Sequence, residues 1–237
     1  MNSNHITIMK INHNNRVGIR NRAFTLIELL TVMAIIAILG GVGFPAIQSA
    51  LLQGKMAAAT SNARSIGLSL RTYATDNEGL FPSGENVYEE EITTSNDAFR
   101  SLIPDYVADE RIFAVPRSAW GREADNRFED PAEILEGGEN HFAYVSGLTD
   151  TSRPNFPLVV DGTDGNGTYI DSLGSKGGCW EGRKAVVAFV GGHAKLVTLR
   201  GRGSDARYIP RDGYEDENAL DVGYMGENVR LLEPTEG

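Results

Sequence analysis

Glu28 is the one ionisable side chain inside a long apolar segment of the sequence. A carboxylate costs about 2.5–3.5 kcal/mol at the centre of a bilayer and less near its edge, so such a group usually has a partner and a role. Two explanations follow from the residue alone. The carboxylate lies at the headgroup boundary, or it caps the N-terminus of its own helix, where an acid is favoured.

A second group of oxygen-bearing side chains surrounds a Gly-rich stretch and consists of Asp161, Asp164, Asn166 and Asp171. Ca²⁺ takes 6–8 oxygen ligands, so this stretch is a candidate calcium loop. Its spacing fits no EF-hand, and ordinary turn chemistry of Asp, Asn and Gly is the alternative. The acidic run 211–217 is a weaker candidate, for which a solvated charge run is the alternative.

Catalytic and cofactor-binding patterns are sparse. After residue 23 the histidines are His141 and His193, and the sequence has no nucleophile elbow, phosphate loop or paired-His helix. The single cysteine, Cys179, excludes an intrachain disulfide framework and a Cys-rich zinc site. The formal net charge of −10 argues against a nucleic-acid partner. We therefore expect that the protein is not an enzyme, and the sequence indicates no certain cofactor.

Charge is distributed unevenly around the apolar segment. Residues 1–23 carry four basic and no acidic side chains, whereas the rest carries 18 basic and 32 acidic ones. Residues 24–47 would reach about 36 Å as a helix, enough to cross a hydrocarbon core of about 30 Å. The asymmetry predicts a single span with a cytoplasmic N-terminus and an exported C-terminal part. An ordinary secretory signal has a shorter apolar stretch, about 7–15 residues.

The sequence after Pro45 predicts that the helix continues to about Asp76–Gly79. Apolar residues recur at spacings of three and four, which is one stripe of a helix that must lie against a sheet downstream. This stripe consists of Leu52, Met56, Ala59, Ala63, Ile66, Leu70 and Tyr73. Residues 83–140 are irregular, with a helical turn expected at 98–103.

Four short segments predict antiparallel strands, at 142–145, 157–161, 185–190 and 193–199. Gly191 and Gly192 suit a two-residue hairpin turn between the last two. One long N-terminal helix packed on a small antiparallel sheet is an α+β fold.

The stretch Arg22-Ala23-Phe24-Thr25-Leu26-Ile27-Glu28 resembles the prepilin cleavage and methylation motif of type IV pilins and type II secretion pseudopilins. The resemblance implies cleavage by a prepilin peptidase between Ala23 and Phe24, and methylation of the new N-terminus at Phe24. Ala23 is a mild departure, because Gly is commoner before the cut. Glu28 would then pair with the amino group of a neighbouring subunit, which relieves two buried charges and fixes the register between helices.

The same resemblance implies a division into four parts: a leader 1–23, a membrane and assembly half-helix 24–47, an amphipathic half-helix 48–79, and an exported pilin-like α+β domain 80–237. The expected function is a structural subunit of a type IV pilus-like or type II secretion filament. The expected partners are the prepilin peptidase, copies of itself and other pilins, an inner-membrane assembly platform and lipid. The alternative is a binding module or enzyme that uses a pilin-like helix as its membrane anchor.

A second resemblance lies near the last two strands. Glu181, nine residues and then Gly191-Gly192-His193 looks like the processing-associated prepilin domain, whose pattern is His, nine residues, then Asp-Gly. Glu181 stands where the pattern has His, and Gly191 stands where it has Asp. Because both side chains are altered, we expect a structural hairpin here.

Overall fold

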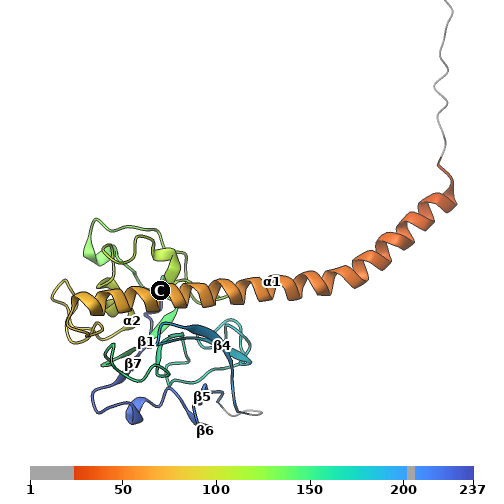
Figure 1. Cartoon of the computed structure of the whole chain (residues 1–237). Helices are drawn as coiled ribbons and strands as arrows, with labels where there is room; N and C mark the ends of the chain where they lie inside the picture. Colours follow the sequence, from red (N-terminus) through yellow and green to blue (C-terminus); the bar gives the residue numbers. More distant parts are fainter. Residues whose placement is uncertain (1–23, 202–205) are drawn as a thin grey trace, which may run out of the picture. The chain divides into compact units, whose positions relative to one another are not determined.

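The computed structural model describes residues 24–201 and 206–237 (Figure 1). The chain divides into two units between Gln48 and Ser49. The expected leader, 1–23, lies outside the described residues. The helix α1 (Leu26–Asp76) is continuous over 51 residues and includes Pro45. It is long and apolar enough to cross a membrane by length and composition.

In the first unit, every side chain described between residues 24 and 48 is exposed. The large apolar ones expose about half or more of their surface, from Val32 at 47% to Leu26 at 87%. A helix that is apolar on all sides has no internal core to cover it, so this part of the chain needs lipid or other helices.

In the second unit, α1 buries the stripe that its spacing predicts, and the prediction that this stripe packs on a sheet is confirmed. The fully buried members are mostly small, and they allow close approach: a Cβ built on Gly67 would lie 3.5 Å from the Cβ of Ala188 in the sheet. The buried residues are Met56, Ala59, Ala63, Ile66 and Leu70 of the predicted stripe and, in addition, Ala74. Leu52 and Tyr73 of the predicted stripe are half-buried against the same core. The helix ends where expected, with the Gly79 amide donating to the carbonyl of Ala74 at 2.7 Å.

The sheet is antiparallel and five-stranded, in the order β4-β3-β2-β1-β7. Its strands are β1 (Phe142–Ser146), β2 (Pro157–Asp161), β3 (Lys184–Phe189), β4 (Ala194–Thr198) and β7 (Arg230–Leu232). The three inner strands are buried almost throughout. The four predicted strands are confirmed to within a residue or so at their ends, whereas β7 was not predicted.

The β3–β4 connection corrects the prediction of a two-residue turn. The Phe189 amide donates to the carbonyl of His193 at 2.9 Å, and the Gly192 amide donates back to the carbonyl of Phe189 at 2.8 Å. The loop therefore has three residues, 190–192. Gly192 has φ +83°, the left-handed conformation that closes such a loop.

Short elements cover the rest of the second unit. A two-stranded hairpin, β5 (Pro210–Arg211) with β6 (Tyr214–Asn218), follows β4 in the chain. The helix α2 (Ser95–Arg100) begins at a capping box formed by Thr94 and Asp97, three residues earlier than the helical turn expected. The described residues also form the short 3₁₀ helices η1 (Glu110–Phe113), η2 (Pro131–Glu133) and η3 (Val222–Tyr224).

Candidate functional site

The start of α1 is held by a reciprocal contact between Thr25 and Glu28. One oxygen of Glu28, Oε2, accepts from the Thr25 amide and from the Thr25 hydroxyl, each at 2.9 Å. The Thr25 hydroxyl oxygen in turn accepts from the Glu28 amide at 3.3 Å. This reciprocal pair is a capping box. In the isolated chain, Glu28 therefore caps the N-terminus of its own helix.

The same geometry leaves one side of the carboxylate open. Oε1 of Glu28 forms no hydrogen bond with any residue that the structure describes. Phe24, directly before the cap, is 80% exposed and Ala23 lies outside the described residues. The cap therefore fixes the direction of the carboxylate and keeps Phe24 outside the helix, with one carboxylate oxygen available to a cation.

The proposed calcium residues are not brought together in one site. Asp161 is buried, and its Oδ1 accepts from the Val186 amide at 2.8 Å on the neighbouring strand. Asp164 accepts instead from the Thr168 hydroxyl at 2.6 Å and from the Asn166 amide at 2.9 Å. Within 24–201 and 206–237, no three His, Cys, Asp or Glu side chains form a metal-binding group. The calcium loop therefore stays a prediction without geometric support.

Asp161 has become a buried structural acid. Burial raises its pKa to about 7, although the Val186 amide and the Tyr169 hydroxyl stabilise the charged form. The sequence places Asp161 at the end of an apolar strand, and an exposed position in the following turn would agree with the sequence equally well. Asp161 is buried because its strand pairs with β3, in which Val186 lies 25 residues further along the chain.

Glu181 and His193 lie at opposite ends of β3 and do not form a common site. Glu181 pairs with Arg117 at 2.6 Å, which lowers the pKa of its carboxyl group. The His193 ring stacks on Phe189 with centroids 4.6 Å apart. These contacts are those of a structural hairpin. The resemblance of this segment to the processing-associated domain stays unconfirmed.

His141 is held as a buried neutral ring. Its Nδ1 accepts from the Val115 amide at 2.9 Å, and Nε2 lies 3.0 Å from the carbonyl of Gly138. This pattern fixes the tautomer with hydrogen on Nε2. Burial lowers the pKa of His141. A Cβ on Gly121 would lie only 1.8 Å from Nε2, so the ring is packed against backbone and does not face a site.

Two further buried acids were not predicted. Glu110 accepts from the amides of Leu135 at 2.8 Å and Asn126 at 3.0 Å, and Glu139 accepts from the Glu136 amide at 2.8 Å. Burial raises the pKa of both carboxyl groups. Each fastens loops between residues 110 and 140, and no local sequence signal distinguishes them from surface acids.

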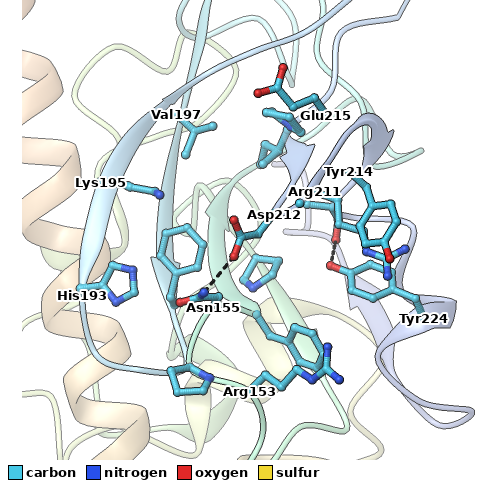
Figure 2. Close-up of a pocket in the computed structure, with 18 residues that line it drawn as sticks. Arg153, Asn155, His193, Lys195, Val197, Arg211, Asp212, Tyr214, Glu215 and Tyr224 are labelled. Atoms are coloured by element: carbon cyan, nitrogen blue, oxygen red, sulfur yellow. Dashed lines mark hydrogen bonds between the residues drawn. The ribbon is translucent and has the colours of Figure 1, made fainter.

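A cleft of about 620 Å³ lies between β4, the loop 153–157 and the β5–β6 hairpin (Figure 2). Phe189, Lys195 and Val197 line it from the sheet. Successive side chains of a strand alternate between faces, and Ala188 faces α1. The cleft is therefore on the sheet face away from the helix. Sequence analysis did not find it, because its walls are distant in the chain.

Comparison with known families matches the N-terminal segment of the chain. Residues 19–44 match the family described as prokaryotic N-terminal methylation motif. A search of curated proteins and a search of solved structures each gave no match. The motif supports the resemblance of the N-terminal segment to type IV pilins and pseudopilins, and the long helix packed on an antiparallel sheet is consistent with a pilin-like α+β fold. Together the motif and the apolar helix fit a single-pass membrane-anchored protein.

Proposed function

We propose that this chain is a structural subunit of a type IV pilus-like or type II secretion filament. In this proposal a prepilin peptidase cuts after Ala23, Phe24 is methylated, and the subunits assemble through their N-terminal helices. The motif at 19–44, placed directly on an uninterrupted apolar helix, is the observation that carries it. The basic residues before the span and the acidic excess after it support a cytoplasmic N-terminus and an exported second unit.

The capping geometry suggests how one carboxylate serves two purposes. Oε2 of Glu28 is occupied by Thr25 of the same chain. Oε1 is then the atom that would accept the Phe24 amine of a neighbouring subunit. Pairing the two charges would remove the cost of burying either one alone between packed helices. We propose a structural role for the protein and no catalytic one.

Processing is tested by mass spectrometry of the protein extracted from membranes. The mature chain should begin at a methylated Phe24. Ala23→Asp should block cleavage, whereas Ala23→Gly, which restores the commoner residue, should be cleaved at least as well as the parent. A mature N-terminus near Leu51, or a parent chain that stays uncut in the presence of the peptidase, would contradict the proposal.

Assembly is tested by separating the charge of Glu28 from its capping role. Glu28→Gln keeps an acceptor for Thr25 but removes the charge, since Gln also serves in a capping box. Filament yield should collapse in Glu28→Gln and Glu28→Val, with normal membrane levels of the mature chain. Glu28→Asp should retain partial assembly, and Leu29→Val is the control. A parent-like filament yield from Glu28→Gln would show that Glu28 serves only as a helix cap.

A further inference from the structure

The cleft in the second unit has hydrogen-bond donors without acceptors. Lys195 and Arg153 are exposed on its lining and form no ion pair or side-chain hydrogen bond with the residues that the structure describes. Each instead lies near a ring: the Lys195 Nζ is 5.0 Å from the centroid of Phe189, and the Arg153 guanidinium carbon is 5.9 Å from that of Phe156. Both cations keep their full donor capacity for a ligand.

The two acids of the cleft have different partners. Asp212 accepts from the Asn155 amide group at 2.9 Å, and Glu215 pairs with Arg200, which lies outside the cleft. Arg211 is likewise used within the chain, paired with Glu217 and stacked on Tyr224 at 3.8 Å. Asn155 is neutral, so Asp212 keeps its negative charge, and Lys195 and Arg153 together leave the lining with an excess of one positive charge for a ligand. This is notable in a chain whose formal net charge is −10.

The walls between these charges include apolar surface. Phe156 meets Tyr224 edge to face with centroids 5.6 Å apart, and Pro154, Pro157 and Pro210 contribute further apolar surface. In Figure 2, His193 and Lys195 line one side, Arg211, Tyr214 and Tyr224 line the other, and Arg153 lies at one end. A volume of about 620 Å³ is in the range of ligand-binding clefts, about 300–1,000 Å³.

We propose that this cleft binds an acidic peptide segment of another protein, with carboxylates on Lys195 and Arg153 and an apolar side chain against the half-buried Phe156. The shared chemistry is a carboxylate attached to an apolar body. Because the two cations lie at separate places on the lining, a segment with two carboxylates flanking one ring satisfies both. This inference does not depend on filament assembly, since the cleft lies wholly within the second unit.

The experiment is calorimetric titration of the full processed chain in detergent micelles with the peptide acetyl-Glu-Phe-Glu-amide. Saturable binding is expected, and it should weaken as salt is raised. The uncharged acetyl-Gln-Phe-Gln-amide should bind at least about tenfold more weakly, because charge-assisted hydrogen bonds are lost. Phenylacetate tests whether a free organic acid is the source of the carboxylate, and a polyuronate tests an acidic saccharide.

Lys195→Gln and Arg153→Gln should each weaken peptide binding by about tenfold. Lys184→Gln and Arg64→Gln are matched controls, because they remove the same charges from exposed positions outside the cleft. All four side chains are exposed, so the variants should fold. The proposal is overturned by no saturable binding, by equal binding of the uncharged peptide, by cleft variants that match the controls, or by tighter binding of phenylacetate or polyuronate than of the peptide.

Discussion

The two halves of α1 belong to one helix but differ completely in what covers them. Between residues 24 and 48 every described side chain is exposed, whereas from Met56 to Ala74 the helix contributes a fully formed stripe to a core. The first half is apolar on all sides and the second on one side only. The difference shows that the first half depends on surroundings outside its own chain, while the second is satisfied within it.

The acids of the two regions differ in the same way. Glu28 is exposed and has one carboxylate oxygen free of the described residues, whereas Asp161, Glu110 and Glu139 are buried with backbone amides as donors. A buried acid with partners in its own chain stabilises a fold. An acid left open on an apolar helix is suited to a contact with another chain.

The sharpest way to break this comparison is to place one carboxylate in each half. Ala63→Asp introduces an unpaired acid at a fully buried position and should destabilise the second unit by on the order of 5 kcal/mol or more. Ile36→Asp should leave that stability unchanged and instead reduce membrane insertion, at a cost of about 3 kcal/mol. Thermal unfolding in micelles and membrane fractionation measure the two effects. Equal effects of both variants on thermal unfolding would show that the two halves of α1 do not differ in what covers them.

The second prediction uses pH to test the buried acid. Folded Asp161 stays protonated up to about pH 7, while the unfolded chain ionises it near its usual 3.8. Stability should therefore fall as pH rises from about 4 to 7, by on the order of 4 kcal/mol from this group. Asp161→Asn should remove that part of the slope.

The measurement is the difference between parent and Asp161→Asn in denaturant unfolding across this pH range. His141 acts with the opposite sign: its lowered pKa makes stability fall as pH drops below about 6.5. Because His141 is the same in both proteins, its contribution cancels in the difference. A parent and variant with parallel pH profiles would show that Asp161 ionises normally in the fold.

The third prediction compares one leucine from each half. Leu70 is fully buried against the sheet, and Leu30 is 67% exposed. Leu70→Ala should cost about 3 kcal/mol of unfolding free energy, through lost burial and a cavity. Leu30→Ala should change it by less than about 0.5 kcal/mol. A large loss in Leu30→Ala would mean that the first half of the helix supports the second unit.

The smallest expected effect concerns the cap. Thr25→Val removes the hydroxyl that bonds to Glu28, and should cost the first turn of α1 about 1 kcal/mol. Faster hydrogen exchange of the Glu28 amide in micelles would register it. Thr25→Ser keeps the hydroxyl and should exchange like the parent. Unchanged exchange in the valine variant would show that the cap does not order this turn.

Local patterns were sufficient for the helix and the buried strands. The stripe from Met56 to Leu70 and the apolar segments at 142–145 and 185–190 carry their own periodicity. The sequence does not predict β6, because Tyr214-Glu-Asp-Glu-Asn218 is polar and has low strand propensity. β7 has three residues and becomes a strand only by pairing with β1.

The site residues also differ in whether local sequence patterns are sufficient to identify them. Glu28 was found because its surroundings are local: an apolar run and a threonine three residues earlier. The burial of Asp161 and the cleft around Lys195 depend on strands and loops far apart in the chain. Nothing near Lys195 indicates that Phe189 and the β5–β6 hairpin will line the same cleft.

The pairing of β1 with β7 also sets an order in time. Tyr144, Val145 and Ser146 bond to residues 230–232, which follow every other strand of the chain. Until those residues have been synthesised, β1 is an open edge with unpaired backbone groups. In that interval another copy's residues 230–232 fit the edge as well as the chain's own. Slowing the arrival of this segment should therefore favour swapped dimers over monomers.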